Sequence, residues 1–459
     1  MRLKRITALF LAVLTCVFTL TAGVSAAEKK GIKLDQTKVT VAVGETCTLK
    51  PSLVGYKKAT VQWSSSDKSV ATVKKGVVTA LKAGTAKITV KIKNTDYKAV
   101  CTVTVTNKKS DKKQSSEKTF ASGKELTAKM GVGWNLGNTL DSIGTWINGD
   151  LEHETAWGNV KTTKAMIDAV KKAGFKTVRI PVSWGEHMNA NGKVNSVWMD
   201  RVQEVVDYAY DNGMYVILNT HHDNSWIKLN EKDEAAVSKK YKYLWQQIAE
   251  RFKDYDERLI FEGLNEPRTE GSAKEWSGGT AAEHEVLNRY YKVFVSAVRG
   301  KGGYNKTRYL MIAPYAASSS YSAMSALEIP DDDRIIVSVH SYSPYSIALD
   351  TNSKDQTFTE NGKREIDSVF SNIEKAFTSK GIPVIMGEFG TLNKSNTEER
   401  VKVAEYYVST AKKYGIPCVW WDNGSIVQAS GSEGFGLLDR SKVEWYYSDI
   451  VKALVNSAK

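Results

Sequence analysis

The sequence predicts two folded parts, a small all-β sandwich followed by a larger α/β domain that forms a (β/α)8 barrel. Residues 31–105 alternate apolar and polar positions in short runs, and residues 106–118 contain no apolar residue. The remaining 340 or so residues, about the size of a barrel with loop insertions, repeat helix and strand patterns eight times. The predicted organisation is a signal peptide, a sandwich, a linker and a barrel, over residues 1–26, 31–106, 107–119 and 120–459.

The first 26 residues have the pattern of a secretory signal peptide. Arg2, Lys4 and Arg5 precede an apolar stretch from Ile6 to about Val24, and small residues suited to cleavage follow it. Several threonines interrupt the stretch, which argues against a permanent anchor, and no later segment approaches the length of a membrane span. The sequence therefore predicts a secreted protein, extracellular or cell-wall associated, whose mature chain has no membrane span.

Positive charge is concentrated in the N-terminal part of the mature chain. Residues 28–118 hold 20 lysines, no arginine and seven acids, whereas the chain from Thr119 onward is close to −3. An excess of lysine favours nucleic acid or another anionic partner. For an exported protein, a solvated lysine-rich surface or contact with an anionic cell-wall polymer is the better interpretation, and we expect no nucleic acid partner.

The N-terminal module has the short, turn-separated strands of an all-β sandwich. Its segments 63–73, 76–80 and 83–86 resemble the bacterial group 2 immunoglobulin-like domain, which implies the fold but not a function. Cys47 and Cys101 should both point inward. A disulfide between them stays open, because the sequence does not give the separation of their Cα atoms.

The C-terminal part repeats a junction in which glycine ends an amphipathic helix before a hydrophobic strand, as at Gly174 and Gly381. Polar or aromatic residues follow nearly every strand, which favours a barrel over a doubly wound sheet with one switch point. Cys418 lies in the last strand and is expected to be a buried thiol. The eight predicted strands cover residues 131–138, 177–182, 215–222, 259–265, 309–314, 335–341, 384–388 and 418–422.

Two glutamates follow apolar runs that are typical of buried strands. Glu266 lies in Asn265-Glu266-Pro267 after one such run, and Glu388 lies in Gly387-Glu388-Phe389-Gly390 after another. A carboxylate at the C-terminal end of a barrel strand faces the mouth where barrels bind ligands. Paired carboxylates at that position are the reacting groups of a glycoside hydrolase.

Cofactor and metal chemistry are not supported by the motifs. The segment 131–134 resembles the start of a dinucleotide loop, but Leu136 replaces its third glycine, and there is no P-loop. His221 and His222 are adjacent, lie outside any His-Glu-x-x-His helix, and should point to opposite sides of a strand. We therefore expect no cofactor and no catalytic metal.

The strand ends together form a constellation that resembles glycoside hydrolase family 5 over residues 120–455. Residues at seven separate strand ends match that family in type and order. Segments 131–141, 154–158 and 179–184 further resemble its endoglucanase branch, which has broad β-glucan activity. The matching residues are Arg179, His221, His222, Asn265, Glu266, His340, Tyr342, Glu388 and Trp421.

The resemblance and the chemistry give the two glutamates different roles. Glu388 is the expected nucleophile and must be ionised, which a nearby Arg179 would favour. Glu266 is the expected proton donor and base. It must begin protonated, which the charge of Glu388 and partial burial both promote. This pairing predicts retention of configuration, with the carboxyl groups about 5–5.5 Å apart.

The remaining residues are expected to bind and orient. Asn265 is placed to hydrogen-bond the sugar 2-hydroxyl, His340 to tune Glu266 and Tyr342 to orient Glu388. Which of the two adjacent histidines faces the sugar stays open. Indole faces suit stacking on glucose, and this role is predicted for tryptophans in or beside the mouth loops, Trp146, Trp184, Trp226 and, in the subsite for the cleaved sugar, Trp421. Packing roles are predicted for Trp198, Trp245 and Trp420.

These inferences predict a secreted, monomeric endo-β-1,4-glucanase that acts on cellulose-type and mixed-linkage β-glucans. Two alternatives remain open. The same barrel could serve a xyloglucanase, a xylanase or a mannanase, which share its catalytic residues and differ in the loops 141–160, 223–240 and 268–285. Alternatively, the protein could bind cell walls or carbohydrate through its immunoglobulin-like module, with the barrel secondary.

Overall fold

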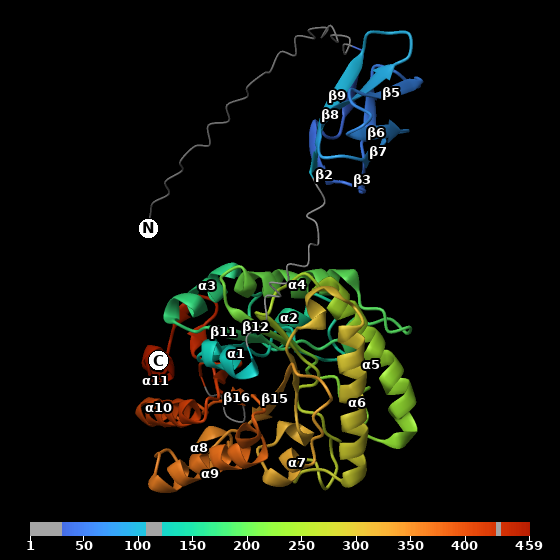
Figure 1. Ribbon diagram of the computed structural model, residues 1–459. Coiled ribbons are helices and arrows are strands. Elements are labelled where there is room, and N and C mark those ends of the chain that lie inside the picture. Colours follow the sequence, from blue (N-terminus) through green and yellow to red (C-terminus); the bar gives the residue numbers. More distant parts are fainter. Residues whose placement is uncertain (1–29, 107–121, 428–432) are drawn as a thin grey trace, which may run out of the picture. The chain divides into compact units, whose positions relative to one another are not determined.

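The computed structural model describes residues 30–106, 122–427 and 433–459 (Figure 1). The chain divides into two compact units, Met1–Thr119 and Phe120–Lys459. The predicted signal peptide and the predicted linker lie outside the described residues. Within the described part of the chain, no helix is long and apolar enough to cross a bilayer.

The N-terminal unit is the β-sandwich that the sequence predicted. Its strands are β1 Gly31–Leu34, β2 Lys38–Ala42, β3 Thr46–Thr48, β4 Pro51–Val54, β5 Val61–Ser65, β6 Ala71–Lys74, β7 Val77–Ala80, β8 Gly84–Ile92 and β9 Lys98–Thr106. They form a four-stranded sheet in the order β2-β9-β8-β5, a three-stranded sheet in the order β3-β7-β6, and a β1-β4 pair.

Alternate side chains of these strands form the core of the sandwich. Ile88 of β8, Val103 of β9 and Val78 of β7 are fully buried in one cluster. Cys101 belongs to the same cluster, Cys47 packs against it, and both are free thiols. Of the two outcomes that the sequence left open for this pair, the structure therefore has the one without a disulfide.

The C-terminal unit contains a closed barrel of eight parallel strands in the order β10 to β17, which confirms the predicted fold. Most strands end earlier than predicted, because the functional residues that follow them have left the hydrogen-bonded ladder. The barrel strands are β10 Gly133–Leu136, β11 Thr177–Ile180, β12 Tyr215–Asn219, β13 Leu259–Glu262, β14 Leu310–Ile312, β15 Ile335–His340, β16 Val384–Phe389 and β17 Cys418–Asp422. A short hairpin of β18 Leu438–Asp439 and β19 Glu444–Trp445 follows.

Helices surround the barrel (Figure 1). The α-helices are α1 Gly123–Met130, α2 His153–Ala156, α3 Lys164–Ala173, α4 Ser196–Tyr210, α5 Glu231–Arg251, α6 Ala281–Arg299, α7 Tyr321–Ser325, α8 Tyr345–Ala348, α9 Glu360–Ala376, α10 Thr397–Lys413 and α11 Ser448–Ala458. Short 3₁₀ turns lie at Gly185–His187, Gly303–Lys306, Tyr315–Ala317 and Thr378–Lys380. The predicted left-handed cap is present at Gly174, where φ is 110° after α3.

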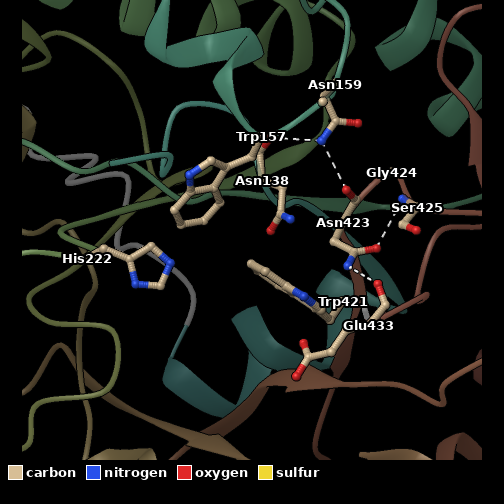
Figure 2. Close-up of a pocket in the computed structure, with 10 residues that line it drawn as sticks. Asn138, Trp157, Asn159, His222, Trp421, Asn423, Gly424, Ser425 and Glu433 are labelled. Carbon is tan, nitrogen blue, oxygen red and sulfur yellow. Dashed lines mark hydrogen bonds between the residues drawn. The ribbon is translucent and has the colours of Figure 1, made fainter. Parts of the chain in front are cut away.

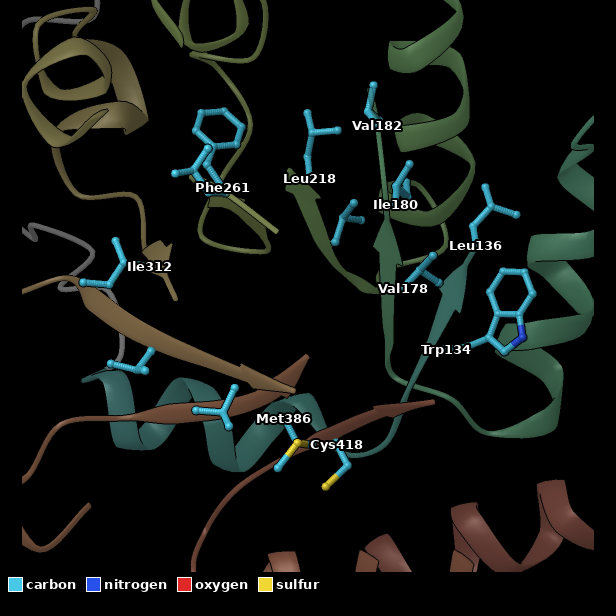
Figure 3. Packing of buried hydrophobic residues seen from close by; sticks show 14 of the residues in the cluster. Trp134, Leu136, Val178, Ile180, Val182, Leu218, Phe261, Ile312, Met386 and Cys418 are labelled. Atoms are coloured by element: carbon cyan, nitrogen blue, oxygen red, sulfur yellow. The ribbon is translucent and has the colours of Figure 1, made fainter. Parts of the chain in front are cut away.

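The two faces of each barrel strand bury different residues. Outward side chains such as Val178, Leu218 and Phe261 pack in the large core between the barrel and its helices (Figure 3). Inward side chains such as Ile217 and Ile260 form a separate apolar cluster. Because side chains alternate along a strand, residues two positions further toward the carboxyl ends share this interior face. For Ile217 and Ile260 these residues are Asn219 and Glu262, which are polar and fully buried, as is Arg179 on β11.

Candidate active site

Glu388 lies on β16 with both carboxylate oxygens engaged. Its Oε1 accepts a hydrogen bond from Arg179 Nη1 at 2.7 Å, and its Oε2 accepts one from the Tyr342 hydroxyl at 2.8 Å. The residue is 4% exposed. A Cβ at the preceding Gly387 would come 2.9 Å from His340 Nε2, so glycine lets this strand approach its neighbour. Glu388 is thus fixed in orientation and paired with a cation.

Arg179, on β11, connects four polar side chains on the barrel interior. Besides Glu388, it donates to Glu262 Oε2 at 2.7 Å, to Asn265 Oδ1 at 2.7 Å and to Asn135 Oδ1 at 3.0 Å. Burial lowers the pKa of Arg179, but the charges of Glu262 and Glu388 outweigh burial and raise it. The guanidinium therefore carries a permanent positive charge beside the Glu388 carboxylate, as the sequence predicted.

Glu266 follows β13 and faces Glu388 across His340. His340 Nδ1 lies 2.9 Å from Glu266 Oε1 and 3.6 Å from Glu388 Oε2. One carboxylate oxygen from each glutamate and a ring nitrogen of His340 all lie within 4.8 Å of one another. The Glu266 side chain is 18% exposed, so this carboxylate is partly accessible to solvent.

The protonation of Glu266 differs from the expectation that its own burial and Glu388 keep it protonated. Burial does raise the pKa of Glu266, but the hydrogen bond and charge of His340, together with Arg268 and Arg179, lower it overall. Burial lowers the pKa of His340, whereas Glu388 and Glu266 raise it overall. These opposite shifts favour a protonated His340 beside an ionised Glu266, with His340 Nδ1 2.9 Å from the Glu266 carboxylate.

Asn265 and His221 form the next layer of contacts. Asn265 is 5% exposed, and its Nδ2 lies 3.3 Å from His221 Nε2. The His221 ring stacks parallel to Trp421, with the centroids 5.7 Å apart. Burial lowers the pKa of His221 well below its ordinary value and that of His222 to about 4, so both rings are neutral.

A cavity of about 640 Å³ opens beside this group (Figure 2). Trp421 and His222 line it, and His222 rather than His221 is therefore the histidine that faces the open space. Glu433 is another lining residue, and partial burial and the charges of Glu266 and Glu388 raise its pKa. The remaining lining residues are Asn138, Trp157, Gly158, Asn159, Asn423, Gly424 and Ser425.

The aromatic predictions had mixed outcomes. Trp198, Trp245 and Trp420 are fully buried, which confirms their packing roles. The prediction for Trp184 was wrong, because it is also fully buried and its Nε1 donates to the carbonyl of Asn219 at 2.9 Å. Trp146 is 68% exposed. Trp226 is half-buried, with Lys240 Nζ 4.4 Å from its ring centroid and Nε1 bonded to Asp223.

Sequence reasoning missed several buried carboxylates, of which Glu262 and Asp141 adjoin the site residues. Glu262 ends β13 and accepts from both Arg179 and Ser338. A charged residue directly after the apolar run 259–261 was the available signal. Asp141 accepts from the backbone N–H groups of Asn138 and Thr139, and burial raises its pKa to about 6.

Two clusters have side-chain atoms close enough to be considered as metal ligands. One is Asp141 with His221 and His222, whose Nε2 atoms lie 4.0 Å and 3.9 Å from Asp141 Oδ2. Both oxygens of Asp141 already accept backbone hydrogen bonds. The other cluster is Glu266, His340 and Glu388, whose atoms are already held by hydrogen bonds to one another and to Arg179 and Tyr342. In the second cluster, His340 Nε2 is buried and has no hydrogen-bond partner among the described residues.

The chain is similar to two known families in its two parts. The family described as "Cellulase (glycosyl hydrolase family 5)" matches residues 140–426. The family described as "Bacterial Ig-like domain (group 2)" matches residues 29–103. These matches coincide with the barrel and with the sandwich, respectively.

Relatives and solved structures match over the barrel. Endoglucanase A of Clostridium longisporum is 49% identical over 343 residues, which span 74% of this chain and 66% of that protein. Endoglucanase 1 of Ruminococcus albus is 50% identical over 347 residues, which span 74% of this chain and 82% of that protein. The structure of a GH5-4 broad specificity endoglucanase from Clostridium longisporum has a TM-score of 0.71 and 48% identity, and covers 74% of this chain and 98% of its own.

Proposed function

The chain belongs to glycosyl hydrolase family 5, and on that premise we propose that it is an endo-β-1,4-glucanase acting with retention of configuration. Its substrates are cellulose-type and mixed-linkage β-glucans. The observation that supports this most directly is Glu388 held between Arg179 and Tyr342, with the carboxylate of Glu266 across from it.

In the proposed first step, Glu388 attacks the anomeric carbon while Glu266 protonates the departing glycosidic oxygen. The proton reaches Glu266 along the 2.9 Å hydrogen bond from His340. The second step reverses these roles, because Glu266 then accepts a proton from the water that attacks the glycosyl–enzyme bond. Asn265, fixed by Arg179, is proposed to bind the sugar 2-hydroxyl, where hydrogen bonds strengthen in the transition state.

The short distance between the two glutamates supports retention. Their nearest carboxylate oxygens lie within 4.8 Å. Retaining enzymes place the carboxyl groups about 5–5.5 Å apart, whereas inverting enzymes separate them by about 6.5–9.5 Å to admit a water. Glu388 is therefore proposed to form a covalent intermediate rather than to activate water directly.

The sugars on the non-reducing side of the cleaved bond are proposed to occupy the cavity beside Trp421. Its lining combines flat indoles with amides and His222, the mixture of stacking and hydrogen-bonding groups that suits a glucan chain. The alternative substrates differ from unbranched glucan in chemistry: xyloglucan is branched, xylan lacks the hydroxymethyl group on C5, and galactomannan is branched and has an axial 2-hydroxyl in its backbone sugars. Only the loops around the cleft decide among them.

Initial rates of reducing-end release by the purified protein test this substrate assignment. The substrates are carboxymethylcellulose, mixed-linkage β-glucan, xyloglucan, xylan and galactomannan. We expect the two unbranched glucans to be cleaved fastest. Activity confined to xylan or mannan would change the substrate assignment and leave the proposed mechanism in place. No activity on any of the five would reject the enzymatic proposal in favour of a binding protein.

Replacing His340 by asparagine is expected to move the alkaline limb of the kcat/KM profile to lower pH. In the native protein the raised pKa of His340 keeps a proton available to Glu266 above the ordinary titration range of histidine. Without His340, Glu266 alone must hold that proton, and a carboxylic acid loses it at lower pH. The measurement is kcat/KM on cellopentaose between about pH 4 and pH 9.

β-Cellobiosyl fluoride serves as the control for the His340 variant. Its leaving group departs as fluoride and needs little protonation, so its alkaline limb should be the same in both proteins. An unchanged alkaline limb on cellopentaose would show that His340 positions Glu266 without supplying its proton.

The N-terminal module is proposed to contact an anionic cell-wall polymer. On the outward face of the four-stranded sheet, Lys38 and Lys87 both lie opposite Thr102, and Lys91 lies directly opposite Lys98. Like charges in that position repel, and an anionic ligand would relieve the repulsion. Among the described residues 30–106, the one ion pair joins Lys91 to Asp96 at 3.6 Å.

Co-sedimentation of the full chain with bacterial cell walls and with insoluble glucan tests this contact. Replacing Lys87, Lys91 and Lys98 by glutamine should reduce wall binding severalfold at low salt, with no effect on cellopentaose hydrolysis. Equal binding by this variant, or binding to glucan instead, would contradict an anionic wall partner.

Three further proposals concern the organisation of the chain. We propose secretion by a signal peptide over residues 1–26, which mass spectrometry of the mature protein can check. The proposed domain limits are 31–106, 107–119 and 120–459, which limited proteolysis can check, and the proposed monomeric state can be checked by light scattering.

A further inference from the structure

The loop between β13 and α6 carries an exposed indole near the proposed proton donor. Trp276 is 66% exposed, and among the tryptophans of the described residues only Trp146 is comparably exposed, at 68%. Large exposed aromatic side chains that neither pack in the core nor cover a neighbour are typical of binding surfaces. Nothing in the proposed mechanism so far uses Trp276.

Arg268 connects this indole to Glu266. Its guanidinium carbon lies 4.6 Å from the centroid of the Trp276 ring, a cation–π distance. Its Nη1 lies 3.6 Å from Glu266 Oε2 and donates to the backbone carbonyl of Glu266 at 3.1 Å. A single guanidinium therefore spans the gap between the indole and the carboxylate, and it occupies only one face of the ring.

The loop around Trp276 is held by its neighbours. Glu275 accepts from Arg268 Nε at 3.1 Å and from the Gly271 N–H at 2.7 Å. Glu270, which lies 3.5 Å from Arg268, also accepts from the side chain of Asn224 in the loop after β12, at 2.9 Å. These contacts fix the position of Arg268 before any substrate arrives, and binding platforms need such preorganisation.

The loop is also anchored at both ends. The Thr269 N–H donates to the Tyr315 hydroxyl at 3.0 Å. Gly279, at φ +71°, allows the chain to lie against that ring, because a Cβ there would come 2.7 Å from it. Thr280 and Glu283 then form the capping box that begins α6.

The position of Trp276 and Arg268 indicates which part of the substrate they would contact. Glu266 protonates the oxygen of the departing sugar, so that sugar leaves past Glu266 and its neighbour Arg268. The cavity beside Trp421 is lined by loops after β10, β12 and β17, and neither Arg268 nor Trp276 belongs to it. Trp276 therefore lies near the proposed proton donor and outside the lining of the Trp421 cavity.

We propose that the free face of Trp276 stacks on a sugar on the leaving-group side of the cleaved bond, and that Arg268 positions the indole for this contact. The proposal rests on the endo-β-glucanase function proposed above, and it assigns a residue to a part of the substrate. Endo-acting cleavage requires such contacts, because an internal bond has sugars on both sides of the reacting glutamates. Stacking against an indole suits β-linked glucose, whose ring faces are apolar.

Trp276→Ala is expected to lower kcat/KM on cellopentaose about tenfold, the loss of one stacking contact. The same variant should stay within about twofold of the native protein on β-cellobiosyl fluoride, which has no sugar on the leaving-group side. With cellopentaose labelled at its reducing end, the fraction cut with two or more sugars on the leaving side should fall. Trp276→Phe keeps an aromatic face and should recover most of the cellopentaose activity.

Tyr243→Ala is the matched control, because it removes an exposed aromatic ring, 40% exposed, from the outer helix α5. It should leave both substrates unaffected. An equal loss on both substrates in Trp276→Ala would show a structural role for the indole, and no loss on cellopentaose would show that no sugar binds there. Either result overturns the assignment. A native protein inactive on both substrates would overturn the proposed function itself, which is a separate outcome.

Discussion

Replacing Glu388 by glutamine is expected to lower kcat by about ten-thousandfold or more on cellopentaose. The amide is nearly the same size as the carboxylate but cannot attack the anomeric carbon. It also cannot match both of its neighbours, because Arg179 and Tyr342 each donate a hydrogen bond to one carboxylate oxygen. Initial rates from cellopentaose at saturating concentration measure the effect.

The comparison with Glu266→Gln separates the two roles. Glu388→Gln should be equally inactive on β-cellobiosyl fluoride, since every substrate needs the nucleophile. Glu266→Gln should lose about a hundredfold to ten-thousandfold on cellopentaose but retain most of its activity on the fluoride, whose leaving group needs little protonation. The reverse pattern would exchange the two assignments, and near-native activity of either variant on cellopentaose would reject its catalytic role.

Replacing Arg179 by methionine is expected to lower both stability and activity more than any other single change away from the two glutamates. Arg179 is fully buried and hydrogen-bonds Glu262, Asn265, Asn135 and Glu388. Methionine leaves two buried carboxylates without their cation, which costs about 3–5 kcal/mol in the free energy of unfolding. Denaturant unfolding of the purified variant measures this loss.

The double variant Arg179→Met with Glu262→Gln tests the physical reason for the loss of stability. Removing the charge of Glu262 should restore part of the free energy of unfolding, since one unpaired carboxylate is gone. Activity should stay low, because Glu388 still lacks its cation and Asn265 its anchor. Additive losses in the double variant would show that the two residues do not depend on each other.

The barrel could be predicted from the sequence because its signals are local. Apolar runs, the glycine that ends a helix at Gly174, and functional residues just after each run all lie within a few positions of one another. The site residues at strand ends were predictable for the same reason, since a barrel brings every strand end to one mouth. The arrangement of Arg179 beside Glu388, 209 residues away, followed from the fold as soon as the strands were assigned.

What could not be predicted depends on contacts between distant residues. Glu262 is paired with Arg179, 83 residues away, and a charged residue at a strand end is otherwise indistinguishable from a solvated loop acid. Trp184 is buried because its indole N–H finds a carbonyl on the neighbouring strand, at Asn219. The pKa values of Glu266 and His340 shift in opposite directions because several charged groups act together, and no local pattern encodes that balance.

The covalent intermediate offers the most direct test of the central claim, that Glu388 is the nucleophile of a retaining β-glucanase. A 2-deoxy-2-fluoro-β-cellobiosyl fluoride should inactivate the protein, because the 2-fluorine slows both steps while the fluoride leaving group keeps formation of the trapped sugar faster than its release. Mass spectrometry of the digested protein should then find one fluorocellobiosyl group on the peptide that contains Glu388. Attachment at Glu266, or hydrolysis of cellopentaose with the α-anomer formed first and no adduct, would contradict the account.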